Sequence, residues 1–212
     1  TTLDYKLQEQ VENILKTEVE KLKSAKAGNA AAVVLDPKNG QILAMVGSKD
    51  YFAEDYDGQV NVALSLRQPG SALKPFTYVT AFKAGYTSAY VLMDVPTEFP
   101  AGEGQPMYKP VNYDGKYRSP QQVRFALGNS INIPAVKILA LVGIKNMLRT
   151  AYDAGLKTLE PTDENLSRFG LSVTLGGGEV KLLELTNAYG TLAAEGVHHE
   201  LAPILNVGDR SG

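Results

Sequence analysis

The order of the apolar segments constrains the fold of this chain more than any other feature. Short β-type runs lie near both ends, at residues 31–35, 41–46 and 199–207. Segments with helical periodicity or helix caps lie between them, at 71–85, 119–128, 134–143, 144–155 and 181–194. Strands at both ends and helices in the middle predict an α+β fold, with the end segments in one antiparallel sheet beside a helical cluster.

Turn and capping residues fix several boundaries. Residues 36–40, Asp-Pro-Lys-Asn-Gly, separate the first two apolar runs and indicate an antiparallel hairpin. Ser119, Pro120 and Gln122 are typical of a helix start, with Ser119 as the N-cap. Residues 93–118 are rich in proline and glycine, so we expect a long irregular excursion there.

The first 26 residues have the pattern of one amphipathic helix. Leu7, Val11 and Ile14 recur at helical spacing among charged residues. Thr1 and Asp4 have the spacing of a capping box. We therefore predict a linker helix at 1–26 that leads into a domain at 27–212.

Composition excludes several kinds of chemistry. The 212 residues have 21 Lys and Arg against 23 Asp and Glu and no basic tract, so nucleic-acid binding is not expected. The apolar stretch 133–142 is too short to span a bilayer, so no membrane contact is expected from this segment. With no cysteine and only the adjacent His198 and His199, we expect no metal centre, no cofactor and no His-based triad.

Ser71 and Lys74 form the first candidate site. Chance alone predicts about 0.7 Ser-x-x-Lys matches in such a chain, so the context must carry the interpretation. The pair lies at the start of a predicted helix, where side chains at i and i+3 share a face and can touch. A neutral lysine can activate a serine if its pKa falls by about 3 units, which burial and the positive helix end favour. The alternative is a capping serine with a solvated lysine.

Ser130 and Asn132 form the second candidate. They lie between a helix that ends at Gly128 and one that Pro134 opens, so a short exposed connection presents a hydroxyl and an amide. Such groups suit proton relay and recognition of a substrate amide, although Ser-x-Asn in isolation is usually a plain turn.

These two motifs and their flanks resemble the penicillin-binding transpeptidase domain of bifunctional, class A penicillin-binding proteins. The similar segments follow in order through most of residues 30–205: 67–76 (RQPGSALKPF), 112–117 (NYDGKY), 126–137 (ALGNSINIPAVK) and 183–190 (LELTNAYG). The resemblance implies a β-lactamase/transpeptidase-like fold, with 27–212 as its N-terminal portion.

The resemblance also implies a chemistry. Ser71 would attack the D-Ala-D-Ala carbonyl of a peptidoglycan stem peptide, with Lys74 as the base and Ser130 as the proton relay. Asn132 would hold Lys74 and the substrate backbone. A second stem peptide would then accept the acyl group, and β-lactam antibiotics would acylate Ser71. The parent protein would be anchored in the membrane, and the reaction would occur on the outer face of the bacterial cytoplasmic membrane.

The family's third motif, Lys-Thr/Ser-Gly, has no match in the chain. Lys16, Lys23 and Lys157 each precede Thr or Ser, but no Gly follows. Residues 210–212, Arg-Ser-Gly, resemble the motif superficially, yet 208–212 has the composition of a hairpin tip. We therefore expect a second chain or fragment to supply the rest of the domain, and this chain alone to be inactive.

Other interpretations remain open. The same nucleophile could pass its acyl group to water, as in a D,D-carboxypeptidase or a β-lactamase, although a β-lactamase usually has Asp where Ile131 stands. A β-lactam sensor or scaffold that is acylated without turnover is a third possibility. Gly176, Gly177 and Gly178 lack the Lys-Ser/Thr of a phosphate loop, so a tight turn is expected there.

Overall fold

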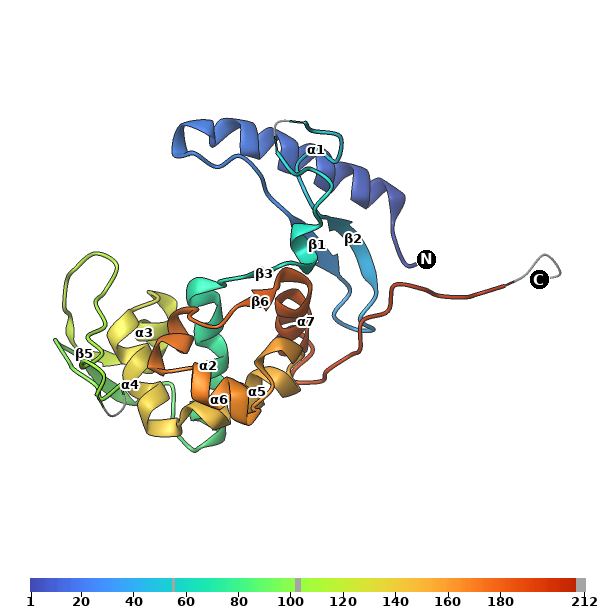
Figure 1. Ribbon diagram of the computed structural model, residues 1–212. Helices are drawn as coiled ribbons and strands as arrows, with labels where there is room; N and C mark the ends of the chain where they lie inside the picture. The colour runs from blue at the N-terminus through green and yellow to red at the C-terminus, as the bar shows by residue number, and fades with distance from the viewer. Residues whose placement is uncertain (55, 102–103, 209–212) are drawn as a thin grey trace. The chain divides into compact units, whose positions relative to one another are not determined.

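The computed structural model describes residues 1–54, 56–101 and 104–208, and the chain divides into two compact units (Figure 1). The first unit contains residues 1–67, 154–156 and those from 180 onward. The second unit contains residues 68–153 and 157–179. Strands dominate neither unit, because the described sheets have two strands each and the remaining elements are helices. The predicted α+β class is confirmed.

A long helix opens the first unit. Helix α1 (Tyr5–Lys21) starts after Asp4, whose carboxylate accepts the N–H of Leu7 at 3.1 Å. Asp4 is therefore the N-cap, and the capping box predicted with Thr1 as the cap is wrong. The helix buries Leu15 and Val19 against Val46, and a short 3₁₀ turn, η1 (Lys23–Ala25), follows it. The boundary between a linker helix at 1–26 and a domain at 27–212 stays a prediction.

The predicted hairpin is confirmed. Strands β1 (Ala32–Leu35) and β2 (Ile42–Val46) pair antiparallel across the turn at 36–40. Gly40 in this turn has a φ of 73°, and a Cβ on it would lie 2.1 Å from the carbonyl oxygen of Glu200. Only glycine tolerates both this backbone conformation and this close approach.

The strand predicted at 199–207 is wrong. Within the described part of this segment, the contact with the hairpin is one parallel bridge between Gln41 and Ala202. Pro203 follows directly and has no N–H to continue a ladder. The end segments therefore do not share an antiparallel sheet. The hairpin tip predicted at 208–212 lies almost wholly outside the described residues.

The first unit is completed by a second helix and a short strand pair. Helix α7 (Leu182–Ala193) packs on β1, and the 3₁₀ turn η2 (Val62–Leu64) lies against α7. Strand β3 (Leu66–Arg67) pairs antiparallel with β6 (Val180–Lys181), which leads directly into α7.

The second unit is a helical cluster. Its longer helices are α2 (Lys74–Lys83), α4 (Asn132–Val142) and α5 (Ile144–Asp153). Shorter helical segments surround them: η3 (Gly70–Leu73), α3 (Val123–Gly128), η4 (Lys157–Leu159), α6 (Asp163–Arg168) and η5 (Leu171–Leu175). Helix α4 packs against α2 and η5, and most of its side chains are buried. The central helices were predicted from their apolar periodicity, and they are confirmed with small shifts of their ends.

The helix start predicted at Ser119 is wrong. Strand β5 (Ser119–Gln122) pairs antiparallel with β4 (Val91–Asp94), and α3 begins only at Val123. Ser119 has a φ of 59°, which is not the extended conformation of an N-cap. Pro120 is tolerated because a two-stranded sheet has only edge strands. Between Asp94 and Ser119 the described chain is irregular apart from one bridge, as expected.

No helix in the described part of the chain has both the length and the apolar character needed to cross a membrane. The described residues also contain no group of three or more His, Cys, Asp or Glu side chains that could hold a metal ion.

Candidate active site

The backbone before Ser71 is held by the glycine turn at 176–178. Gly176 ends η5 in the left-handed conformation, with a φ of 93°. A Cβ on Gly176 would lie 2.2 Å from the backbone nitrogen of Gly70, so the two segments touch through their main chains. The tight turn predicted at these glycines is confirmed, and it packs the 3₁₀ turn η3, which carries Ser71, against η5.

Ser71 and Lys74 lie in different environments although they are three residues apart. Ser71 is exposed, and its hydroxyl makes no hydrogen bond to any other described residue. Lys74 begins α2 and is only 1% exposed. Burial lowers the pKa of Lys74 from 10.5 to about 8. The alternative interpretation, a capping serine with a solvated lysine, is therefore wrong.

The Lys74 amine is surrounded by acceptors from the turn between α3 and α4. It donates to the carbonyl oxygen of Ser130 at 2.5 Å, to the Ser130 hydroxyl at 3.1 Å and to Oδ1 of Asn132 at 2.7 Å. An ammonium group has three donors, and these partners use all three. The structure thus brings Lys74, Ser130 and Asn132 together. The hydrogen bonds of the Lys74 amine in the described structure go to Ser130 and Asn132, and none goes to Ser71.

The conformation of Ser130 explains how one residue contacts Lys74 twice. Its backbone has a φ of 52°, which is uncommon for a residue other than glycine. The N–H of Ser130 donates to Leu127 and that of Ile131 to Ala126, both at 2.9 Å, which closes the end of α3. This left-handed turn directs both the carbonyl and the hydroxyl of Ser130 to the lysine.

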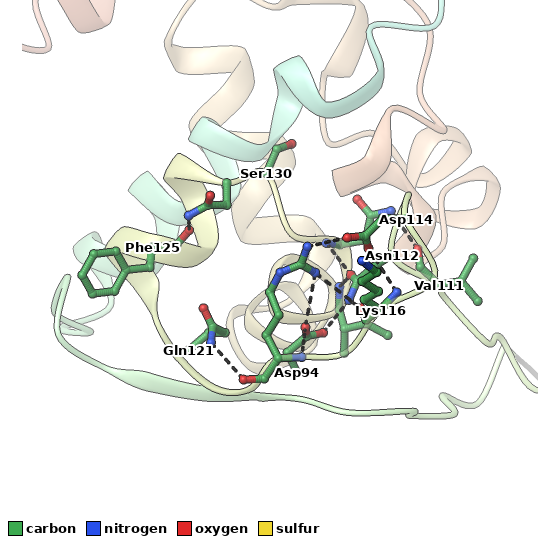
Figure 2. A network of polar contacts seen from close by, with 12 residues as sticks. Asp94, Val111, Asn112, Asp114, Lys116, Gln121, Phe125 and Ser130 are labelled. Carbon is green, nitrogen blue, oxygen red and sulfur yellow. Dashed lines mark hydrogen bonds and ion pairs between the residues drawn. The ribbon is translucent and has the colours of Figure 1, made fainter.

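Two residues outside the predicted set hold Asn132. The carbonyl oxygen of Val111 accepts Nδ2 of Asn132 at 2.8 Å, and Oδ1 of Asn112 accepts its backbone N–H at 3.0 Å. Both belong to a polar network in the irregular segment before β5 (Figure 2). Asn112 entered the sequence interpretation only as part of a flanking segment, because nothing in its local pattern indicates that it is buried.

Comparison with known proteins identifies the family of this chain. The family model described as penicillin binding protein transpeptidase domain matches residues 30–205, and the chain belongs to this family. Penicillin-binding protein 1A of Rickettsia bellii is 33% identical over 184 residues, which cover 87% of this chain and 22% of that protein. The chain therefore spans less than a quarter of the length of this relative.

Solved structures of penicillin-binding proteins have a similar fold. The crystal structure of penicillin-binding protein 1A from Haemophilus influenzae is 32% identical, with a TM-score of 0.67 over 77% of this chain and 23% of that one. The penicillin-binding protein PonA1 from Mycobacterium tuberculosis shares the fold, with a TM-score of 0.78 at 21% identity. That match covers 95% of this chain and 51% of the other. The predicted resemblance is confirmed, and the chain corresponds to part of these folds.

Proposed function

We propose that this chain carries the nucleophile of a serine D,D-transpeptidase that cross-links peptidoglycan. The observation that carries the proposal is the environment of the Lys74 amine. Lys74 is buried, its pKa is lowered to about 8, and it contacts both Ser130 and Asn132. A serine hydroxyl needs a neighbouring base to become a nucleophile, and Ser71 stands exposed one turn before this amine.

In the acylation step, Oγ of Ser71 attacks the carbonyl carbon between the two D-Ala residues of a stem peptide. Neutral Lys74 takes the hydroxyl proton as the new C–O bond forms. The C–N bond to the terminal D-Ala then breaks, and its nitrogen receives a proton and leaves as an amine. The backbone N–H of Ser71 supplies one donor to the oxyanion.

Ser130 is the partner that suits a proton relay. The Ser130 carbonyl and Oδ1 of Asn132 can only accept hydrogen bonds from Lys74, whereas the Ser130 hydroxyl can both accept and donate. Once Lys74 has taken the Ser71 proton, the Ser130 hydroxyl accepts a proton from the ammonium and gives its own proton to the leaving nitrogen. Lys74 is then neutral again, and the proton from Ser71 has been relayed through Ser130.

In the transfer step, the amine of a second stem peptide attacks the acyl-serine ester. A C–N bond forms, the C–O bond to Ser71 breaks, and the proton of the amine returns to Ser71 through Lys74. β-Lactams would enter the first step by presenting their strained amide to Ser71. The relatives are penicillin-binding proteins, and this supports that part of the proposal.

The partners follow from this chemistry. The substrates are stem peptides, so the site would act at the outer face of the bacterial cytoplasmic membrane, in a parent protein anchored there. The chain spans 51% of the PonA1 structure. The sequence of this chain contains no Lys-Thr/Ser-Gly motif. We propose that residues beyond these 212, in the same or a second chain, supply that motif and the second oxyanion donor.

The test is a product assay on the native protein, isolated with any segments and chains that accompany this sequence. It is incubated with a donor peptide ending in D-Ala-D-Ala and with an amine acceptor. A cross-linked product that disappears in Ser71→Ala supports the proposal. Hydrolysed donor alone would indicate a D,D-carboxypeptidase, and a stable acyl-enzyme without product would indicate a sensor. Either outcome would overturn the transpeptidase assignment.

A further inference from the structure

Helix α4, which carries Asn132, begins without a cap from its own chain neighbours. Its N-cap residue is Ile131, which has no side chain that can accept a hydrogen bond. The first N–H groups of a helix have no partner within the helix and need one from elsewhere. Oδ1 of Asn112 accepts two of them, from Asn132 at 3.0 Å and from Ile133 at 3.2 Å. A loop side chain 20 residues earlier thus caps this helix.

The hydrogen bonds of the Asn112 amide nitrogen fix the orientation of its side chain. Its Nδ2 donates to Oδ1 of Asp94 at 2.8 Å and to the carbonyl oxygen of Lys116 at 2.7 Å. Asp94 is completely buried, and its second oxygen accepts the backbone N–H of Arg118 at 2.8 Å. A flipped Asn112 amide would face the helix N–H groups with its own donors. The Asp94 carboxylate therefore selects the orientation in which Asn112 can cap α4 (Figure 2).

The same segment also fixes the side chain of Asn132. Its Nδ2 donates to the carbonyl oxygen of Val111, which leaves Oδ1 to accept from Lys74 at 2.7 Å. Adjacent loop residues thus hold the backbone and the amide of Asn132 separately. A chain of hydrogen bonds runs from a buried carboxylate to the lysine amine, through Asn112 and Asn132.

We propose that Asp94 and Asn112 are positioning residues for the acylation of Ser71, because they fix the acceptor that holds the Lys74 amine. The inference rests on the proposed function. Asp94 acts through Asn112, and Asn112 acts through Asn132. A 1 Å displacement of a catalytic group can reduce a rate by about a hundredfold, so loss of this support should slow acylation even in a folded protein.

The experiment measures the rate of acylation by a fluorescent penicillin in the native protein, per labelled molecule, as a function of pH. In Asn112→Ala, we expect the maximal rate to fall about tenfold or more. Displacement of Oδ1 of Asn132 from the Lys74 amine also removes an acceptor that favours the ammonium form of Lys74. The pKa of Lys74 should then fall, and the acid limb of the profile should move to lower pH. A residue with only a structural role would reduce the labelled fraction and leave the limb in place.

An exchange of side chains provides a second test that does not depend on the alanine variant folding. Asn112→Asp alone puts two carboxylates within hydrogen-bond distance, and we expect slow acylation. The double variant Asp94→Asn with Asn112→Asp restores an amide donor opposite a carboxylate acceptor, although the Lys116 carbonyl still lacks the donor that Asn112 provides. It should therefore acylate faster than Asn112→Asp, in which neither hydrogen bond is made. Glu98→Gln is the matched control, because it removes an exposed ion pair with Lys109 in the same irregular segment. It should acylate at the wild-type rate.

The outcomes separate the two proposals. If the wild-type protein is acylated but Asn112→Ala retains its rate and pH profile, the positioning role is wrong and the proposed function stands. If Asn112→Ala does not fold, failure of the exchange to restore acylation would overturn the inference. If the wild-type protein is not acylated at all, the proposed function fails first.

Discussion

The proposed role of Lys74 as the base predicts how acylation depends on pH, because the lysine is buried. Its pKa is lowered from 10.5 to about 8, and only the neutral amine can take the proton of Ser71. About 1% of the amine is neutral at pH 6, about 10% at pH 7 and about 50% at pH 8. The acylation rate should therefore rise about fiftyfold between pH 6 and 8, and only about twofold between pH 8 and 10.

A solvated lysine would give a different profile. With the ordinary pKa of 10.5, the rate would still rise about 75-fold between pH 8 and 10. The assay is stopped-flow acylation by a fluorescent penicillin, with the uncatalysed hydrolysis of the penicillin subtracted at each pH. In Lys74→Met, the acylation rate should be much lower and should no longer rise between pH 6 and 8. A flat profile from pH 6 to 9, or the same limb in Lys74→Met, would refute the assignment of Lys74 as the base.

Substitutions at three positions test the packing of the second unit, which contains this lysine. Gly176→Ala combines a positive φ with a Cβ 2.2 Å from Gly70, so urea unfolding should show a loss of at least about 2 kcal/mol, and an unchanged midpoint would contradict the close approach. Ser130→Gly and Ser130→Ala should both be acylated slowly. The glycine variant should be more stable than the alanine variant by about 1 kcal/mol, because glycine adopts a φ of 52° without strain. Equal stabilities of the two variants would argue against that conformation. Tyr78→Phe removes a buried hydroxyl that has no hydrogen-bond partner among the described residues, so it should raise the free energy of unfolding by about 1 kcal/mol and leave acylation unchanged; a loss of stability would show that the hydroxyl has a partner after all.

Local pattern was sufficient for the central helices and for the hairpin. Apolar periodicity and closing glycines predicted α2, α4, α5 and α7, and the turn residues at 36–40 predicted the pairing of β1 with β2. These signals work because the residues that cause each element lie within it or directly beside it.

Long-range pairing explains where local pattern failed. Ser119 has the neighbours of an N-cap, but the segment pairs with β4, 25 to 31 residues earlier in the chain. Residues 199–207 have strand-like composition, yet the contact with the hairpin is a single parallel bridge at Ala202. In both cases a partner distant in sequence decides the conformation, and no local cap or turn rule includes it.

The candidate site was only partly predicted, because it too depends on residues that are distant in sequence. Ser130 and Asn132 could be selected as chemically suitable, and the structure places both on Lys74. Helical spacing predicted that the side chains of Ser71 and Lys74 can touch, but it could not predict that the α3–α4 turn supplies the acceptors of the Lys74 amine. Asp94 and Asn112 were not selected, because their role depends on burial inside an irregular segment.

Acylation of Ser71 is the most direct test of the central claim. Intact-mass spectrometry of the native protein after incubation with penicillin should show one adduct per chain. The adduct should be absent in Ser71→Ala and present in Ser167→Ala, which removes another exposed serine of the second unit. An adduct that survives in Ser71→Ala, or a folded native protein that forms none, would contradict the account.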